Sequence, residues 1–229
     1  MDIGRAFTYV FHDEEWPKKV VIGGLISWIP VLALVADGYG IRALRNAREG
    51  RETPLPKWDD WGHDFVRGLS VFVAALVLGL PMVVSVFLGV VASAVLEEPA
   101  CMWVVWCPGM LWALLVAFFG PALRLQYAKH DSFGALFRLR EVWHIVADRF
   151  GRYLVAVLMT VVATIVAGIT GGVASFIVRV VARITSEVGA SIVSAITASL
   201  PSFIAMLVSA HLLAQLQPAG ATAEPAAVL

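Results

Sequence analysis

Four long apolar runs dominate the pattern of hydrophobic and polar positions along this chain. They cover residues 69–96, 103–123, 153–178 and 188–216. An α-helix needs about 20 predominantly apolar residues to cross the hydrocarbon core of a bilayer, and each run reaches that length. The alternation over about ten residues that marks a membrane-spanning β-strand is not found in them. The pattern therefore predicts an all-α integral membrane protein with four full spans.

A fifth apolar run, residues 20–41, is interrupted by Pro30 near its middle. A full span here would distribute the basic residues over both sides of the membrane. A turn at Pro30 instead leaves all but two of the 17 lysines and arginines, Arg179 and Arg183, on one side, as the positive-inside rule favours. Each arm has about 11 residues, or roughly 16 Å of helix, which suits half a bilayer. We expect a short re-entrant first hairpin, with both termini on the cytoplasmic side of a prokaryotic plasma membrane.

A charged stretch with helical periodicity precedes each hairpin, at residues 1–15, 58–69 and 131–152. One face of each stretch is rich in aromatic and aliphatic residues, which is typical of a helix lying in the membrane interface. The alternative is a loop helix packed on its own protein. Each stretch leads into an aromatic–x–basic–x–aliphatic string, such as Trp16-Pro-Lys18-Lys-Val20. The chain thus reads as one helical membrane domain (1–217) of three repeated units, 1–51, 52–130 and 131–217, each an interfacial helix plus a helical hairpin, with a disordered tail at 218–229.

Composition agrees with a membrane protein, and the motifs of common enzymes are missing. Hydrophobic residues make up 59% of the chain and charged residues 15%, while the formal net charge of zero does not discriminate between partners. The partners expected are membrane lipids, with a homo-oligomer as an open possibility, and no nucleic acid is expected. No glycine-rich phosphate loop, HExxH or GxSxG string is present, so neither a catalytic residue nor a cofactor or metal is expected. Asp59 and Asp60, in the densest polar cluster, are expected to cap a helix N-terminus rather than to bind a cation.

Three strings in the chain are similar to a known family. They are the opening Met1-Asp-Ile-Gly-Arg-Ala-Phe-x-Tyr-Val-Phe, the string Pro54-Leu-Pro-x-Trp58-Asp-Asp-Trp61, and the closing Ala210-His211-Leu-Leu-x-Gln215. They resemble a prokaryotic membrane-protein family known as domain of unknown function 4013, over nearly the whole chain. The resemblance implies a multi-pass bacterial or archaeal membrane protein. It brings no assigned activity and no catalytic residue.

Small residues recur at four-residue spacing in the last two apolar runs. They form two ridges, Ala163, Ala167, Gly171 and Ser175 on one helix, and Ser186, Ala190, Ser194 and Ala198 on the next. Such ridges let helix backbones approach closely in lipid. We favour contact of the two ridges within one hairpin. A contact between subunits, or the lining of a pore or lipid groove, remains open.

Two further pairs of residues stand out. Asp37 and His211 are ionisable groups expected at similar depth near the cytoplasmic face, where they could form a buried polar pair. A proton or cation relay is the functional interpretation, and a structural hydrogen bond is the one we favour. Cys101 and Cys107 flank the expected outer tip of a hairpin, where a disulfide and two free thiols are both open.

Two functions follow from these features. The first is a non-enzymatic membrane scaffold or assembly component that oligomerises, because three interfacial helices and a short wedge-like hairpin on one side would expand one leaflet. The second is a channel or transporter for small or lipidic solutes, because proline interrupts the apolar runs at Pro30, Pro81, Pro121 and Pro201. A water-accessible cavity in mid-membrane would favour the second function, since a scaffold needs none.

Overall fold

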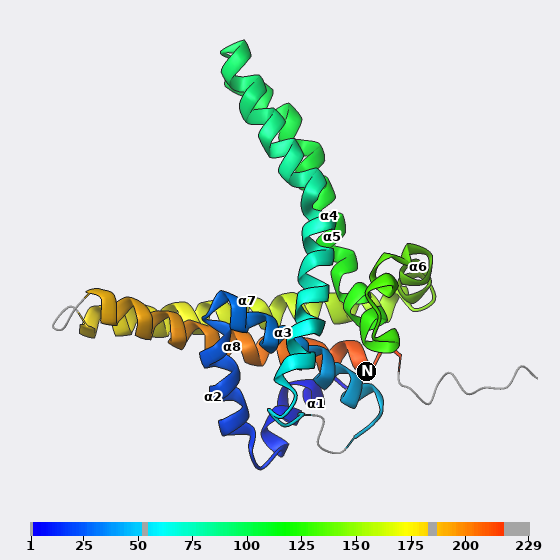
Figure 1. The fold of residues 1–229 in the computed structure, drawn as a ribbon, viewed down its shortest axis with the longest axis vertical. Helices are drawn as coiled ribbons and strands as arrows, with labels where there is room; N and C mark the ends of the chain where they lie inside the picture. The colour runs from blue at the N-terminus through cyan, green and yellow to red at the C-terminus, as the bar shows by residue number, and fades with distance from the viewer. Residues whose placement is uncertain (1, 52–54, 183–186, 218–229) are drawn as a thin grey trace, which may run out of the picture.

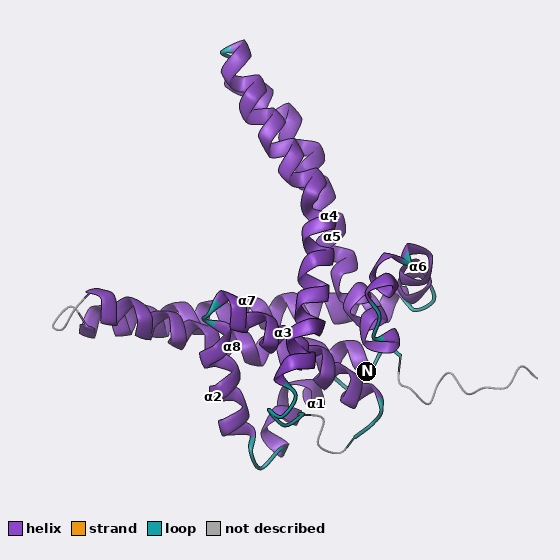
Figure 2. Cartoon of the chain, in the orientation of Figure 1, coloured by secondary structure: helices purple, strands orange, loops and turns teal. Residues whose placement is uncertain are grey.

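The computed structural model describes residues 2–51, 55–182 and 187–217, and helices account for nearly all of them (Figure 2). No strand occurs in these ranges. The helices, in chain order, are α1 (Ile3–Thr8), η1 (Tyr9–His12), α2 (Trp16–Ser27), α3 (Pro30–Arg48), α4 (Trp61–Leu96), α5 (Pro99–His130), η2 (Phe133–Phe137), α6 (Leu139–Ala147), α7 (Phe150–Ala182) and α8 (Glu187–Ala214).

Four of the described helices are long and apolar enough to cross a membrane, and they coincide with the four predicted spans. The candidate segments are Trp61–Leu96, Trp103–His130, Phe150–Val180 and Ser191–Ala214. Their large apolar side chains are mostly exposed, for example Val83 at 63% and Phe87 at 65%. An apolar surface of this extent is stable only when lipid covers it. The chain is accordingly treated as a multi-pass membrane protein.

The first hairpin is broken at the predicted proline. α2 ends at Ser27, and α3 begins with Pro30 in its first turn. Ile29, before the proline, is extended (φ −94°, ψ 117°), because the proline ring disfavours helical backbone in the preceding residue. Both arms are longer than residues 20–41 suggested, since they extend to Trp16 and to Arg48. Neither α2 nor α3 is among the candidate spans of the described chain.

The predicted interfacial helices differ from one another in the structure. The stretch 58–69 is not a separate helix, because α4 begins at Trp61 and continues unbroken to Leu96. Its 36 residues are about 54 Å long, more than the roughly 30 Å of a hydrocarbon core, so the first turns can extend beyond the lipid. In the third stretch, α6 buries Val142 and Val146 in the protein and exposes Trp143. α6 therefore packs on its own protein with one face and leaves an aromatic face outside.

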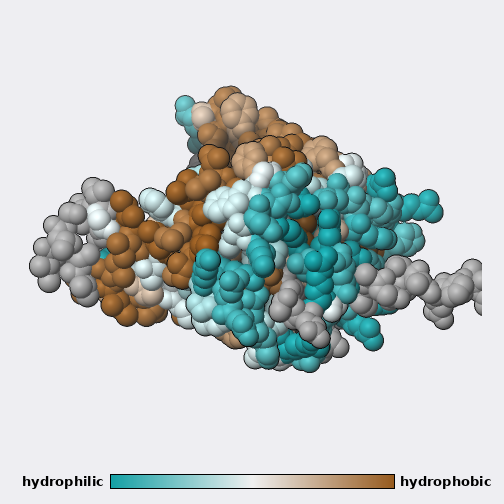
Figure 3. All heavy atoms as spheres, turned by 60° about the horizontal axis from the view of Figure 1, so that its bottom comes forward, coloured by the Kyte–Doolittle hydropathy of each residue, from teal (hydrophilic) through white to brown (hydrophobic). Residues whose placement is uncertain are grey.

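The helices meet at a common base from which two long hairpins extend in different directions (Figure 1). One hairpin is α4–α5 and the other is α7–α8. α3 lies between them and packs on both α4 and α8. Hydrophilic residues gather over the base, whereas the hairpins are hydrophobic (Figure 3). The main apolar core also lies at the base, where Leu44, Leu125, Tyr153 and Leu213 are buried together.

Candidate functional site

Residues 55–61, the described part of the string Pro-Leu-Pro-x-Trp-Asp-Asp-Trp, contact both arms of the first hairpin. The side chain of Leu55 is buried, and its carbonyl oxygen accepts a hydrogen bond from Lys19 Nζ (3.2 Å). The Tyr39 hydroxyl donates to the carbonyl oxygen of Pro56 (2.8 Å). The Trp58 ring stacks on Tyr39 at 4.0 Å between centroids, and its Nε1 donates to the Lys19 carbonyl oxygen (3.1 Å). The segment that joins α3 to α4 is thus held along both arms of the hairpin.

A second buried contact fixes the start of the same hairpin. Lys19 Nζ lies 2.7 Å from Asp13 Oδ2, and both side chains are less than a tenth exposed. A buried ion pair of this kind leaves a costly unpaired charge if one partner is removed. It ties the turn before α2 to α2 itself and, through Leu55, to the α3–α4 connection.

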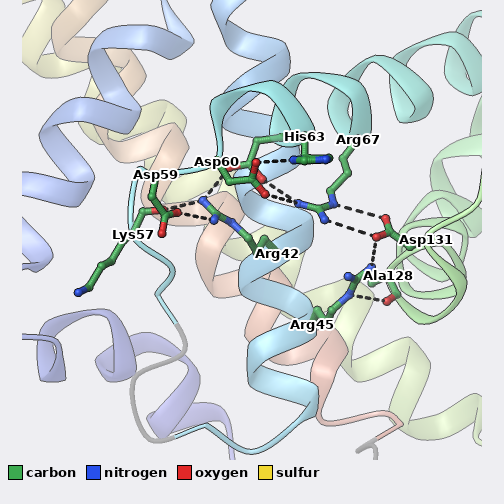
Figure 4. Close-up of polar contacts among 10 residues, drawn as sticks. Arg42, Arg45, Lys57, Asp59, Asp60, His63, Arg67, Ala128 and Asp131 are labelled. Atoms are coloured by element: carbon green, nitrogen blue, oxygen red, sulfur yellow. Dashed lines mark hydrogen bonds and ion pairs between the residues drawn. The ribbon is translucent and has the colours of Figure 1, made fainter.

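Arg42 of α3 is the centre of an ion-pair network at the base (Figure 4). Its guanidinium contacts Asp59 Oδ1 (2.7 Å) and Asp64 Oδ2 (2.8 Å), and donates to the carbonyl oxygen of Lys57 (2.6 Å). Asp64 is fully buried, and its second carboxylate oxygen contacts Arg67 at 3.2 Å. Each carboxylate oxygen of Asp64 thus has an arginine partner, and these two charged contacts offset the cost of burying the carboxylate.

Asp131 extends the network to the end of α5. Arg45 lies 3.0 Å and Arg67 3.4 Å from its carboxylate, and Arg45 Nε donates to the carbonyl oxygen of Ala128 (3.2 Å). Partial burial raises the pKa of Asp131, but hydrogen bonds from Arg67 and Arg45 outweigh that effect and hold the pKa below its usual value. The network therefore joins α3, α4 and α5 through residues that lie far apart in the sequence.

The predicted capping role of Asp59 and Asp60 is wrong. Asp60 is the N-cap residue of α4 but makes no side-chain cap hydrogen bond. It contacts His63 instead (2.5 Å), and Asp59 pairs with Arg42. A hydrogen bond from Arg42 is the main cause of the lowered pKa of Asp59, and one from His63 has the same effect on the pKa of Asp60. In the described residues no group of three or more histidine, cysteine or acidic side chains is arranged to hold a metal.

α3 and α4 cross at backbone contact beneath this network. A Cβ at Gly38 would lie 1.8 Å from the carbonyl oxygen of Asp64, and a Cβ at Gly68 would lie 1.8 Å from that of Leu34. The two glycines thus face each other's helix at reciprocal positions, one turn apart. Only glycine allows this approach, as in other close helix crossings in membranes.

The N-terminal helix is fixed to the end of α8. The Tyr9 hydroxyl donates to the Leu207 carbonyl oxygen (2.8 Å), and the Tyr9 ring stacks on His211 at 4.3 Å. The backbone N–H of Asp2 donates to Gln215 Oε1 (2.7 Å), while Gln215 Nε2 donates back to the Asp2 carbonyl oxygen (3.0 Å). The opening and closing strings of the chain therefore contact each other.

Asp37 and His211, the predicted polar pair, have different partners. Asp37 Oδ1 lies 3.9 Å from Arg124 of α5. His211 is occupied by the Tyr9 stack, and its buried Nδ1 has no hydrogen-bond partner among the described residues. The two side chains also line different cavities. Sequence reasoning missed Arg124 as the partner of Asp37, and the signal that it offered was a basic residue directly after the apolar run 103–123.

A cavity of about 350 Å³ lies between the first hairpin, α5, α7 and α8, and we call it the junction cavity. Asp37 and Arg124 line it together with five hydroxyl residues. These are Ser27, Thr160, Thr164, Ser202 and Ser209. Thr164 and Ser202 stand near the midpoints of the candidate spans Phe150–Val180 and Ser191–Ala214. The cavity therefore extends from Arg124 to the central part of two helices that are long and apolar enough to cross a membrane.

The small-residue ridges meet within the α7–α8 hairpin wherever both are described. Ser175 Oγ donates to the Ser194 carbonyl oxygen (2.8 Å), and Ser194 Oγ donates to that of Ser175 (3.3 Å). A Cβ at Gly171 would lie 3.1 Å from the backbone of Ala198. Ala163 and Ala167 are buried near the base, packed with α8. Ser186 and the side chain of Ala190 lie outside the described residues.

The choice between a Cys101–Cys107 disulfide and two free thiols cannot be followed in full, because the side chain of Cys101 lies outside the described residues. Cys107 is an exposed free thiol. Both positions belong to the continuous helix α5. Six residues of α-helix rise about 9 Å, which is more than a disulfide spans. A bond between them would require α5 to unwind.

One region of the chain matches a known protein family. It contains the Pro54–Trp61 string, the ion-pair network, and those residues of the junction cavity that lie on α2, α3, α5 and α7. Residues 22–177 match the family described as protein of unknown function (DUF4013). The opening and closing strings, which also resembled that family, lie outside the match. No curated protein and no solved structure matches the chain. Since the matched region covers more than half of the sequence, the chain belongs to the DUF4013 family.

Proposed function

We propose that this chain is a non-enzymatic membrane protein that admits a small polar solute or a lipid head group into the junction cavity, as a channel or transporter does. The observation that carries the proposal is the cavity itself. Its volume of about 350 Å³ falls in the range of ligand sites, roughly 300–1,000 Å³. Its lining combines two charged side chains with five hydroxyls, and three of the helices that contribute to it are candidate spans.

Charged residues on helices that could cross the membrane support this function over a purely structural one. Arg124 directly follows the apolar run 103–123, within the candidate span Trp103–His130, and its side chain is 43% exposed. A charge beside an apolar run is costly when lipid surrounds it, so such residues usually face water or a substrate path. The partner Asp37 is 39% exposed, and the 3.9 Å distance leaves most of the arginine's N–H groups free for other contacts.

Thiol accessibility tests the proposal directly. In a chain with Cys101→Ser and Cys107→Ser, Thr164→Cys places a thiol in the cavity near mid-membrane. Ile165→Cys places one at the same depth on a side chain that is 55% exposed and does not line the cavity. A membrane-impermeant charged thiol reagent reacts with thiolate, which forms in water and not in hydrocarbon. We expect labelling of Thr164→Cys and not of Ile165→Cys in sealed vesicles. Absence of labelling at both positions, or equal labelling, would refute an open cavity.

A scaffold or assembly role is the second candidate, and the divergence of the two hairpins favours it (Figure 1). Hairpins that separate from a base held by ion pairs form a wedge, which would expand one leaflet. The small-residue contact within α7–α8 leaves the outer surfaces of both hairpins for lipid or a second copy. Oligomeric state in mild detergent and remodelling of liposomes test this role. A monomer that leaves vesicle shape unchanged would exclude it.

The membrane orientation belongs to the same proposal. We propose that both termini lie on the cytoplasmic side and that the first hairpin is re-entrant. The contact of Asp2 with Gln215 supports this orientation, because it brings the start of the chain beside the end of α8, and four spans return the chain to the side on which it began. Labelling of single cysteines at Phe11, exposed on η1, and at Val31, exposed at the tip of α3, tests it. We expect Phe11→Cys to react from the cytoplasmic side and Val31→Cys to stay protected from both sides. Reaction of Val31→Cys from the opposite side would show a full span.

A further inference from the structure

The Asp37–Arg124 contact differs from the ion pairs that hold the base together. Arg42 and Asp64 lie 2.8 Å apart, with side chains 16% and 1% exposed. Asp37 and Arg124 lie 3.9 Å apart, and both side chains are more than a third exposed toward a cavity. The first geometry suits a structural bond between helices, whereas the second leaves both charges able to bind something else.

We propose that the junction cavity binds a zwitterionic group, with its anionic part on Arg124 and its cationic part on Asp37. This inference rests on the proposed function, since it requires the cavity to be open. It adds the chemical class of the ligand.

The charge balance of the cavity selects a ligand without net charge. Among the described residues that line it, Asp37 and Arg124 are the only charged ones, so the lining is neutral. A ligand with net charge would leave one charge unpaired in a region of low dielectric constant, which is expensive. An uncharged ligand would leave the two side chains paired with each other at long distance. A zwitterion satisfies both charges and keeps the sum at zero.

Four of the five hydroxyl groups are arranged to accept hydrogen bonds, while the fifth, that of Thr160, is buried and has no hydrogen-bond partner among the described residues. Ser27 donates to the Gly23 carbonyl oxygen (2.6 Å) and Thr164 to that of Thr160 (2.9 Å). Ser202 and Ser209 likewise donate to carbonyl oxygens of their own helix. Because these hydrogens are in use, the hydroxyl oxygens offer lone pairs to the cavity. Lone pairs suit the N–H groups of an ammonium, so the hydroxyls complement Asp37 rather than Arg124.

Phosphoethanolamine held as a phosphodiester is a zwitterion of this chemistry, because it carries one negative charge on the phosphate and one positive charge on the ammonium, whereas the free monoester would carry nearly two negative charges. It occurs in free glycerophosphoethanolamine and as the head group of phosphatidylethanolamine. Its phosphate would occupy the guanidinium of Arg124, which can bind a phosphate through two N–H groups. Its ammonium would lie at Asp37 among the hydroxyl oxygens. The volume of the cavity suits a group of this size, while acyl chains would remain in the lipid beside the hairpins.

Binding to the purified full chain in maltoside micelles tests the inference. Calorimetric titration with glycerophosphoethanolamine, the free phosphoethanolamine ligand of these experiments, is compared with titrations of inorganic phosphate and of ethanolamine. We expect phosphoethanolamine to bind most tightly, and each of Asp37→Asn and Arg124→Gln to weaken it about 10- to 100-fold, as expected when one charge-assisted contact is lost. Asp59→Asn, which removes an exposed carboxylate outside the cavity, serves as the matched control and should leave binding unchanged.

The single variants also separate the two ends of the ligand. Asp37→Asn should abolish the preference for phosphoethanolamine over phosphate, and Arg124→Gln the preference over ethanolamine. If a single variant is unstable, the double variant Asp37→Asn with Arg124→Gln has no unpaired charge and should fold without binding. Retained binding in a folded double variant would overturn the inference.

Nanodiscs distinguish the source of the zwitterion. If lipid head groups occupy the cavity, phosphatidylethanolamine nanodiscs should block binding of free phosphoethanolamine, and phosphatidylglycerol nanodiscs should not. Equal binding in both nanodiscs assigns the site to free solutes. The two experiments can give different answers. If Thr164→Cys is labelled from water but the chain does not bind phosphoethanolamine, the inference is overturned and the proposed function stands. Failure of that labelling overturns the proposed function itself.

Discussion

Replacement of Asp64 by asparagine isolates the charge at the centre of the basal network. Asparagine has nearly the same shape, so the backbone contact of this residue with Gly38 is kept. What changes is that Arg42 and Arg67 lose the buried carboxylate that both contact, at 2.8 Å and 3.2 Å. Removal of one partner from a buried ion pair costs about 3–5 kcal/mol.

The lower end of that range applies to Asp64→Asn. The two arginine side chains are 16% and 15% exposed, and each keeps a second carboxylate, Asp59 for Arg42 and Asp131 for Arg67. We therefore expect the free energy of unfolding to fall by about 3 kcal/mol. For a chain of this size, this corresponds to a decrease of roughly 6–12 °C in Tm.

Thermal unfolding in mild detergent, followed by tryptophan fluorescence, measures the effect, because Trp58 and Trp61 adjoin the network. The control is Asp60→Asn, whose side chain is 38% exposed and contacts the exposed His63. A surface change of this kind should alter stability by less than about 0.5 kcal/mol. If Asp64→Asn and Asp60→Asn have the same Tm, Asp64 is not a structural centre and the reasoning fails.

Three further predictions concern other contacts in the fold. Gly38→Ala should lower stability by at least about 1–3 kcal/mol, because the new methyl group meets backbone, whereas Gly79→Ala, in open space, should be neutral or slightly stabilising; thermal unfolding compares the two. The lowered pKa of Asp131 means that its ion pairs stabilise the protein above the ordinary value of 3.8 and are lost as pH falls through the lower folded-state pKa. Asp131→Asn should therefore flatten the decline in Tm below pH 4, and an unchanged slope would contradict this account. Tyr9→Phe should cost about 1 kcal/mol by removing a buried hydrogen bond to α8, and should increase hydrogen exchange in α1; an unchanged exchange rate would show that the hydroxyl does not hold that helix.

Local rules were sufficient for the elements themselves. Run length predicted the four spans, and Pro30 predicted the break between α2 and α3, because both depend on residues close together in the chain. Four-residue spacing also predicted the contact of Ser175 with Ser194, since the next helix in a hairpin is its nearest neighbour. These features need no knowledge of which distant helices meet.

The same local rules were wrong where a distant residue competed. Asp59 and Asp60 were assigned to a helix cap because they precede α4, but Arg42, on another helix, offers Asp59 a charged partner. The stretch 58–69 looked like a separate interfacial helix because it has one charged face and one apolar face, and the charged face ends where the apolar run begins at Leu69. Nothing in the backbone ends a helix there, so α4 is continuous.

The sequence by itself determined which segments are long and apolar enough to cross a membrane, and the tertiary structure alone decided which way their side chains face. Asp37 and His211 were expected at similar depth because depth is predicted from position along a helix. Their partners in the structure, Arg124 and Tyr9, depend on the rotation and position of α3 against α5 and of α8 against η1. Those are set by close contacts such as Gly38 on the backbone of α4, which are packing between distant segments and leave no periodic signal in the chain. For this reason the junction cavity, and with it the candidate function, emerged only from the assembled helices.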